Sequence, residues 1–336
     1  MDDDHRYMAA ALALSARHSA RTGRSPSVGC IIVKDGRIIG RGITQPGGRP
    51  HAEAVAIDMA GAAAAGADFY VTLEPCAHDS GRGPDCCGLI ITARPARVIM
   101  ACDDPDPRTA GKGAERLKQA GITLKSGVMA GAAPRMMADF FTVQTRSRPL
   151  VTLKLATSLD GKIALANGAS RWISGEAARR HCHLERARHQ AILVGAGTVR
   201  ADDPSLDVRL SGLEGRSPAR IMLGHGPAPA GWRSVGSPQE IASLPINSLM
   251  IEGGATTASA FLKAGLVDRI LLYRAPIWIG QGQSAINDIG LAQLADAHGQ
   301  WTLADSRMLG KDRMEIYERA DQDKGSIICS PASSQI

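Results

Sequence analysis

Aromatic residues are scarce in this chain: four Trp, four Tyr and four Phe make up 4% of its 336 residues. Proteins that bind single-stranded nucleic acid stack the bases on aromatic rings, so this scarcity argues against such a surface. The Lys and Arg residues leave a net charge of +6, but they are scattered and form no basic run. The partner that we expect is therefore a phosphorylated small molecule and not a nucleic acid.

Long apolar segments and an export signal are also missing. No hydrophobic run approaches the length of a membrane span. The first residues, Met1 to Asp4, are acidic where an export signal is basic. The seven cysteines are odd in number, unlike a disulfide framework. We expect a cytoplasmic protein with no membrane partner, whose thiols bind metal or pack in the core.

The length and composition are those of a globular protein with two domains: 44% of the residues are hydrophobic and 21% are charged. Strand and helix patterns alternate, which predicts α/β domains with mainly parallel sheets. The boundary is expected near residues 145–149, which read Thr-Arg-Ser-Arg-Pro. This gives domains over 1–146 and 147–320, followed by a polar, frayed tail over 321–336.

The expected elements follow from these patterns. In the first half we expect helices over 4–21, 51–65, 86–93 and 113–120, and strands over 28–33, 37–42, 69–73, 98–101 and 122–126. The first two strands form a hairpin that turns at Asp35-Gly36. In the second half we expect helices over 175–187 and 256–264, and strands over 150–156, 191–194, 221–223, 248–251, 269–275 and 315–319.

Three short motifs in the first half carry the residue types of a zinc hydrolytic site. His51-Ala52-Glu53 opens an Ala-rich segment, Glu74-Pro75-Cys76 follows a strand pattern, and Cys86 comes ten residues after Cys76. One imidazole and two thiolates can hold Zn²⁺ and leave its fourth position for water, while Glu53 moves protons. The pattern is similar to the zinc-deaminase signature, H-x-E followed by P-C-x-x-C, but with a wider spacing between the cysteines.

The chemistry also predicts where these residues lie. His51, Cys76 and Cys86 each follow a Pro or a Pro-Asp pair, so each is expected at the start of a helix, whose partial charge favours a thiolate. The alternatives are a structural zinc site and unrelated core cysteines, but the combined motifs favour a catalytic site. His78 and Arg82, between the cysteines, either contact a substrate phosphate or lie in a solvated loop.

The other cysteines and several histidines have a simpler interpretation. The thiols outside the motifs are expected to pack as small hydrophobes; they are those of Cys30, Cys87, Cys102 and Cys182. His181, His183 and His189 share one helical stretch and are expected to be surface or packing residues.

A second site is indicated in the second half of the chain. Four polar or glycine-rich patches lie within residues 152–209, and Glu252-Gly253-Gly254 stands before an expected helix. Two glycines at a strand-to-helix junction let backbone N–H groups approach a phosphate. The strict G-x-G-x-x-G fingerprint is absent, so the spacing alone leaves a nucleotide site and an ordinary glycine turn equally open.

Taken together, the motifs of both halves resemble the bifunctional riboflavin-biosynthesis deaminase/reductase family. The resemblance covers residues 4–319 and rests on these motifs: Val28-Gly29-Cys30, His51-Ala52-Glu53, Thr72-Leu73-Glu74-Pro75-Cys76, Asp104-Pro105-Asp106-Pro107, Ser158-Leu159-Asp160-Gly161-Lys162, Trp172-Ile173-Ser174-Gly175, Thr198-Val199-Arg200-Ala201-Asp202-Asp203-Pro204 and Glu252-Gly253-Gly254. It implies a cytidine-deaminase-like three-layer domain, followed by a dihydrofolate-reductase-like α/β domain. The implied reactions are zinc-dependent deamination of a diaminopyrimidinone that carries ribosylamine 5′-phosphate, and then NADPH-dependent reduction of its ribosyl group to ribityl.

The resemblance also implies roles for individual residues. Zinc is implied at His51, Cys76 and Cys86, and proton transfer at Glu53. The implied cofactor positions are Thr157, Trp172, Thr198, Asp202 and the backbone of Gly253, Gly254, Ala255, Thr256, Thr257, Ala258 and Ser259. The implied substrate positions are Ser170, Arg186, Leu206, Arg209 and Glu252, of which the two arginines suit a phosphate dianion.

The chain departs from the family pattern at several places. Ser25 and Thr44 stand where the family usually has Asn and His. Between Arg220 and Glu252 the chain is shorter than family members usually are, as though a strand–helix unit were missing. The leading interpretation is a bifunctional enzyme and, as the family implies, a homo-oligomer. The alternatives are an active deaminase whose reductase-like half serves only in binding or assembly, and a nucleic-acid base deaminase, which would need a basic, aromatic-rich surface.

Overall fold

The computed structural model describes residues 2–78, 81 and 83–320. Arg82 and the tail over 321–336 lie outside these residues, so the predictions made for them are not addressed. The chain divides into two units, one ending at Ser147 and one beginning at Arg148. Each unit has its own hydrophobic core.

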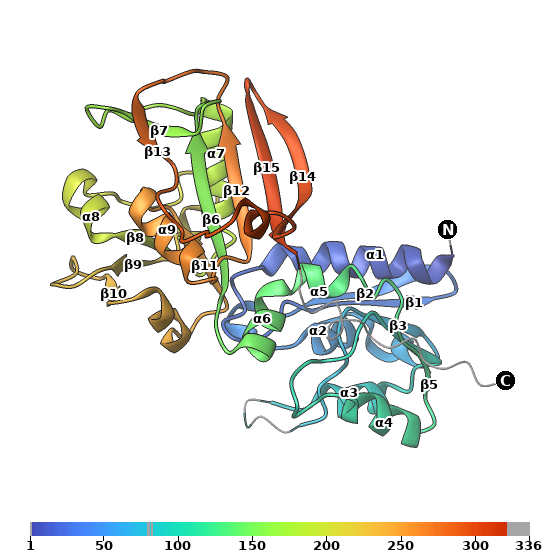
Figure 1. The fold of residues 1–336 in the computed structure, drawn as a ribbon. Coiled ribbons are helices and arrows are strands. Elements are labelled where there is room, and N and C mark those ends of the chain that lie inside the picture. Colours follow the sequence, from blue (N-terminus) through green and yellow to red (C-terminus); the bar gives the residue numbers. More distant parts are fainter. Residues whose placement is uncertain (1, 79–80, 82, 321–336) are drawn as a thin grey trace. The chain divides into compact units, whose positions relative to one another are not determined.

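The first unit is built on a five-stranded sheet with the order β2-β1-β3-β4-β5 (Figure 1). The strands are β1 (Gly29–Lys34), β2 (Arg37–Ile43), β3 (Asp68–Val71), β4 (Arg97–Met100) and β5 (Thr123–Lys125). β1 is antiparallel to both of its neighbours, whereas β3, β4 and β5 are parallel. The predicted hairpin is present, and its turn residues Asp35 and Gly36 both have positive φ.

Helices cover both faces of this sheet. They are α1 (Asp3–Ser15), α2 (Ala52–Ala60), α3 (Cys86–Ala93), α4 (Lys112–Gln119), α5 (Ala133–Met136) and α6 (Ala138–Arg146), with 3-10 turns η1 (Ala16–His18), η2 (Pro46–Gly48) and η3 (Gly61–Ala64). α1 and α5 lie on one face of the sheet, and α2 and α3 lie on the other (Figure 1). The helix predicted over 51–65 ends at Ala60, because Gly61 takes a positive φ of 55°.

Glycines in the hairpin let two helices approach the sheet closely. A Cβ on Gly29 would lie 2.1 Å from the carbonyl oxygen of Ala11 in α1. A Cβ on Gly42 would lie 1.8 Å from the carbonyl oxygen of Ala52, in the first turn of α2. Only glycine fits at either position, and the second contact fixes the start of α2 against β2.

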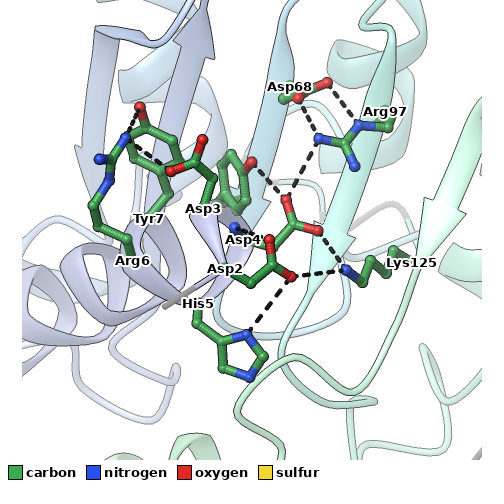
Figure 2. A network of polar contacts seen from close by, with 10 residues as sticks. Asp2, Asp3, Asp4, His5, Arg6, Tyr7, Asp68, Arg97 and Lys125 are labelled. Atoms are coloured by element: carbon green, nitrogen blue, oxygen red, sulfur yellow. Dashed lines mark hydrogen bonds and ion pairs between the residues drawn. The ribbon is translucent and has the colours of Figure 1, made fainter.

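A buried carboxylate connects the start of α1 to three strands (Figure 2). Asp4 is 5% exposed and accepts hydrogen bonds from Tyr70 Oη at 2.8 Å and Lys125 Nζ at 2.5 Å. Arg97, which pairs with Asp68, also reaches Asp4 at 3.4 Å. Burial alone would raise the pKa of Asp4, but the bonds from Lys125 and Tyr70 outweigh it and lower the pKa.

The second unit contains an eight-stranded sheet with the order β10-β9-β8-β11-β6-β12-β15-β14 and a small sheet of β7 and β13. The strands are β6 (Leu150–Thr157), β7 (Lys162–Leu165), β8 (Ala191–Gly195), β9 (Ala219–Leu223), β10 (Arg233–Val235), β11 (Ser248–Ile251), β12 (Arg269–Arg274), β13 (Gly282–Ser284), β14 (Trp301–Leu309) and β15 (Asp312–Arg319). In the large sheet β12–β15 and β15–β14 are antiparallel and the other pairs are parallel, which gives the mainly parallel sheet that was predicted.

Two helices sandwich this sheet. The helical segments are α7 (Glu176–Arg186), α8 (Ala196–Asp202), α9 (Ala255–Lys263), and the 3-10 turns η4 (Glu214–Arg216), η5 (Pro238–Ser243) and η6 (Leu294–Ala297). Alternate residues of the central strands face opposite sides, so Leu193 packs with the cluster of α9 and Val194 with that of α7. Across the shortened stretch 220–252, the chain still forms β10, parallel to β9, and the turn η5.

No helix in the described ranges is both long and apolar enough to cross a membrane.

The Asp4 network leads to a stability prediction. Replacing Asp4 with Asn should lower the free energy of unfolding of the first unit by about 2 kcal/mol at pH 7, because buried donors lose a charged acceptor. A carboxyl with a lowered folded pKa stabilises above its unfolded pKa, so the difference from wild type should shrink as the pH falls below about 4. Urea unfolding of wild type and the Asp4→Asn variant, at pH 7 and at pH values down to about 3, measures this difference in the free energy of unfolding. The control is Asp3→Asn in the same helical turn, where the carboxylate is 71% exposed and the change should stay within about 0.5 kcal/mol. Equal effects of both substitutions would contradict the prediction.

Candidate active sites

The first unit brings His51, Cys76 and Cys86 together. Their ligand atoms all lie within 4.8 Å of one another. His51 Nδ1 is 3.2 Å from Cys86 Sγ and 3.6 Å from Cys76 Sγ. Both cysteines are buried and no disulfide joins them. One imidazole and two sulfurs at this spacing could hold a metal ion, and this is the three-ligand set that catalytic zinc sites use.

Two of these residues lie at helix starts, as predicted, and one does not. His51 immediately precedes α2, and Cys86 is the first residue of α3, where Asp85 Oδ1 accepts a capping bond from Gly88 N at 2.7 Å. Cys76 lies in the loop after β3, so the prediction of a helix start there is wrong. The backbone N–H of Cys86 donates to Cys76 Sγ at 3.4 Å, so the start of α3 supports both sulfurs.

The protonation of the two thiols shows why this site fits a cation. The neighbouring Cys86 lowers the pKa of Cys76 to about 4, and His51 contributes to the same shift. The same contact with Cys76 raises the pKa of Cys86, and burial raises it further. One thiol therefore ionises easily and the second resists. A divalent cation removes this conflict, because it stabilises both thiolates at once.

Glu53 lies in the first turn of α2 and is only 3% exposed. Burial raises its pKa, and the nearby Cys76 adds to the rise, although His51 opposes it. A cavity of about 230 Å³ lies beside the cluster and is lined by Arg49, Pro50, His51, Ala54, Gly83, Pro84, Cys86 and Leu89. Glu53 is therefore a buried carboxyl group with a raised pKa next to the cluster of His51, Cys76 and Cys86.

The loop after β4 contributes a further buried acid that the sequence motifs did not assign to a role. Burial raises the pKa of Asp104 to about 7, and Asp106, Glu74 and Cys76 add to the rise. Glu74 is structural: its carboxylate accepts bonds from the backbone N–H groups of Asp104, Gly111 and Ala114. The signal for Asp104 in the sequence is its place in a Pro-rich acidic motif directly after a strand.

Two residues that stood out in the sequence, Thr44 and His78, make hydrogen bonds within the first unit. Thr44 is buried and its hydroxyl accepts a bond from Val28 N at 2.9 Å. His78 Nδ1 lies 3.1 Å from Thr109 Oγ1. Thr44 and His78 thus each have a hydrogen-bond partner within the protein.

The second unit has a cavity of about 550 Å³. Four of the five expected substrate positions line it, namely Ser170, Arg186, Arg209 and Glu252, together with the expected cofactor positions Trp172 and Gly253. The remaining substrate position, Leu206, is buried in the core beside α7. Thr157, Thr198 and Asp202 do not line this cavity.

A buried ionic cluster forms the floor of this cavity. Arg186 donates from Nε and Nη2 to the Glu252 carboxylate at 2.6 and 3.0 Å, and from Nη1 to the Asp207 carbonyl at 2.9 Å. Lys154 Nζ lies 3.5 Å from Glu252 Oε2, the oxygen that also accepts from Arg186 Nη2. Burial alone would raise the pKa of Glu252, but the two cations lower it to about 2. Lys154 was not predicted as a site residue; its signal is a charge inside an otherwise apolar strand.

Glycines on two neighbouring parallel strands make room at the start of α9. A Cβ on Gly253, after β11, would lie 2.5 Å from Thr257 Cβ, and one on Gly195, at the end of β8, would lie 2.4 Å from Thr257 Oγ1. The first N–H groups of α9 have no side-chain cap. Such an uncapped helix start at the carboxyl edge of a parallel sheet fits the phosphates of a nucleotide cofactor.

Trp172 stands on an anchored loop at the mouth of the cavity. Its side chain is 67% exposed, and the Arg179 guanidinium lies 4.7 Å from its ring centroid. The loop is held by Arg179 Nη1, which donates to Ser174 O, and by Gly175 N, which donates to Asp312 Oδ2 at 2.6 Å. An exposed aromatic face held in this way suits a planar cofactor ring.

Comparison with known families assigns a different family to each half. The family described as "Cytidine and deoxycytidylate deaminase zinc-binding region" matches residues 1–102. The family described as "RibD C-terminal domain" matches residues 149–229 and 239–314. The unmatched residues 230–238 fall within the shortened stretch and include β10.

Relatives span both units. The riboflavin biosynthesis protein RibD of Escherichia coli is 38% identical, over 93% of this chain and 98% of its own length. RibD of Mycobacterium tuberculosis is 41% identical over 90% of this chain and 94% of its own. The solved RibD of Acinetobacter baumannii (form 1) superposes with a TM-score of 0.86 at 35% identity, covering 94% of this chain and 99% of that one.

A solved Thermotoga maritima protein extends the comparison to the two reactions. It is a diaminohydroxyphosphoribosylaminopyrimidine deaminase/5-amino-6-(5-phosphoribosylamino)uracil reductase, and it superposes with a TM-score of 0.85 at 29% identity over 94% of this chain and 99% of its own. These comparisons confirm the predicted fold class, a cytidine-deaminase-like domain followed by a dihydrofolate-reductase-like domain, and zinc and NADPH as the cofactors. The chain belongs to the RibD family of bifunctional riboflavin-biosynthesis deaminase/reductases.

Proposed function

We propose that the two units perform successive reactions on one phosphorylated substrate. Residues 1–146 deaminate the diaminopyrimidinone that carries ribosylamine 5′-phosphate, and residues 147–320 then reduce the ribosyl group with NADPH. The observation that supports this assignment is the pair of separate sites: the buried cluster of His51, Cys76 and Cys86 in one unit and the phosphate-compatible cavity in the other.

In the deaminase site, we assign the metal to His51, Cys76 and Cys86 and proton transfer to Glu53. When bound, Zn²⁺ acts as a Lewis acid that lowers the pKa of a water molecule toward about 7. The Glu53 carboxylate would take one proton from the attacking water and pass it to the ring nitrogen, and would then carry the second proton of that water to the departing amine. Its raised pKa suits both steps, because the carboxyl must accept and release a proton within one turnover.

In the reductase site, the chain aligns two ligands. NADPH supplies the hydride, so the protein's task is to hold the nicotinamide against the sugar carbon. The backbone from Gly253 to Ser259 is assigned to the cofactor phosphates and Trp172 to a planar face of the cofactor. Arg209 is assigned to the substrate phosphate. Arg186 and Lys154 fix the Glu252 carboxylate, which stays ionised and can accept bonds from sugar hydroxyls.

One observation supports a second candidate, a deaminase whose reductase-like unit is inactive. The stretch 220–252 contributes only the three-residue β10 and the turn η5 beyond β9 and β11. Such a short edge would weaken the adenosine end of a cofactor pocket. We nevertheless favour the bifunctional enzyme, because Gly195 and Gly253 still make room for the start of α9, where the cofactor phosphates are expected.

We also propose that the enzyme acts in the cytoplasm as a homo-oligomer, without nucleic acid or membrane. The six described cysteines are free and buried, in agreement with a reducing compartment. The scattered charge and the low aromatic content argue against a nucleic-acid surface. The homo-oligomer rests on the family resemblance.

A product assay tests the proposed function. Zinc-loaded protein is given the diaminopyrimidinone substrate with and without NADPH, and the products are identified by mass spectrometry. Exchange of the amine for a carbonyl, followed by the NADPH-dependent gain of two hydrogens, would support both activities. Loss of the amine alone would favour the deaminase-only alternative.

Replacing Glu53 with Gln should separate metal binding from catalysis. The amide keeps the shape of the side chain but cannot take up and release a proton near neutral pH, so deaminase turnover should fall by about a hundredfold or more. Zinc content, measured by mass spectrometry of the metal, should stay at the wild-type level. The matched control is Cys86→Ser, which should lose zinc as well as activity. If Glu53→Gln loses zinc too, Glu53 is a ligand or a fold element and its assigned role is wrong.

Replacing Gly253 with Ala should weaken NADPH binding. The new Cβ would force Thr257, and with it the first turn of α9, away from its position. The dissociation constant for NADPH, measured by calorimetry, should rise by about tenfold or more, as expected for lost charge-assisted bonds. The control is Gly215→Ala in the same unit, where an added Cβ meets nothing within 4 Å. Unchanged affinity in the Gly253 variant would place the cofactor phosphates elsewhere.

A further inference from the structure

His183 lies in α7 and lines the cavity of the second unit, one helical turn before Arg186. The sequence predicted no role for it beyond packing or surface exposure. The two other histidines of this stretch make hydrogen bonds within the protein. His181 Nδ1 lies 2.8 Å from Tyr273 Oη, and the ring of His189 bonds to Glu185 O and Thr152 Oγ1. His183 is the member of this group that faces the cavity.

The strongest cations of the cavity already have internal partners. Arg186 uses its Nε and both terminal nitrogens on Glu252 and Asp207 O, and Lys154 lies against Glu252. Arg209 is 63% exposed, and its Nε lies 3.5 Å from Asp207 Oδ1. Arg209 therefore needs a second donor beside it if the site is to hold a phosphate dianion firmly.

The hydrogen bonds around His183 determine which ring nitrogen carries the proton. Nδ1 lies 3.1 Å from Asp207 O and 3.3 Å from Arg209 N. Asp207 O already accepts a bond from Arg186 Nη1, whereas Arg209 N–H needs an acceptor. With Nδ1 as that acceptor, Asp207 O keeps its bond from Arg186 and the proton lies on Nε2. In the opposite tautomer Arg209 N–H would lose its partner.

Nε2–H is then the polar group that His183 can offer to a ligand in the cavity. It has no hydrogen-bond partner among the described residues. Burial lowers the pKa of His183, and Arg186 and Arg209 lower it further, against Asp207 O and Glu252, which raise it. The ring is therefore neutral near pH 7.5, with a single proton directed away from the backbone of residues 207–209.

Building on the proposed function, we infer that His183 binds the 5′-phosphate of the reductase substrate through Nε2–H, beside Arg209, and so selects for a phosphorylated substrate. The same ring, through Nδ1, holds the backbone at Arg209 in place. His183 thus has a structural side and a ligand-binding side, and the two can be separated by substitution.

Two substitutions separate the backbone contact of Nδ1 from the proposed phosphate contact of Nε2. Asn places its side-chain oxygen at the position of Nδ1, so His183→Asn keeps the acceptor for Arg209 N–H and removes the donor to phosphate. Gln reaches the position of Nε2, so His183→Gln keeps a donor for the phosphate and removes the backbone contact. Both are made in the full chain. A midpoint of thermal unfolding near the wild-type value shows that each variant is folded.

The measurement is the affinity for the deaminated ribosylamine phosphate without NADPH, by calorimetry, with inorganic phosphate as a competing probe. His183→Asn should weaken substrate binding by about tenfold or more, as expected for a lost hydrogen bond to a charged group. His183→Gln should stay within about threefold of wild type. With the analogue that lacks the phosphate, wild type and His183→Asn should bind alike.

The reverse order, with Gln weak and Asn unchanged, would show a structural role alone and overturn the inference. An equal loss for the phosphorylated and unphosphorylated compounds would overturn it too, as would wild-type protein that binds neither substrate nor phosphate. The binding assay does not depend on turnover. If wild type binds the substrate with the expected variant pattern but does not oxidise NADPH, the proposed function fails while the inference about His183 stands.

Discussion

Close contact between helix starts and glycine backbone is the constraint on which both sites depend. In the first unit, Gly42 lets the first turn of α2 lie on β2, and this turn carries Glu53, two residues after His51. In the second unit, Gly195 and Gly253 make room for Thr257 and so fix the start of α9. A helix start supplies N–H groups and partial positive charge, and it is useful only where it is held rigidly. The lack of a Cβ atom at these glycines therefore determines where the starts of α2 and α9 lie.

The two units place a buried carboxylate in opposite electrostatic surroundings. Burial is the largest influence on the pKa of Glu53 and raises it. Glu252 lies between Lys154 and Arg186, so its pKa falls and it remains a fixed anion. The same residue type thus has a raised pKa in one unit and a lowered pKa in the other, because the neighbours differ.

Much of the fold and of the zinc cluster could be predicted because the signals are local. The turn at Asp35-Gly36 and the Pro-Asp pair before Cys86 each specify structure within a few residues. Cys76 shows where local signals fail, because it follows Pro75 and yet lies in a loop. The helix start next to its sulfur is that of α3, whose first N–H, from Cys86, donates to Cys76 Sγ. Lys154 and His183 were missed for the same reason. Their partners, Glu252 and the backbone at Arg209, are distant in the sequence, and periodicity carries no information about such contacts.

The separate hydrophobic cores bear on how this protein can change over evolutionary time. No core cluster of the described residues contains members from both sides of the Ser147–Arg148 boundary. A substitution that loosens one core therefore leaves the other packed, and selection can act on each activity almost independently. The family match illustrates this freedom, because the residues that it leaves out, 230–238 with β10, belong to the second unit, whereas His51, Cys76 and Cys86 belong to the first. A lineage could therefore alter or lose one activity while the other is inherited intact.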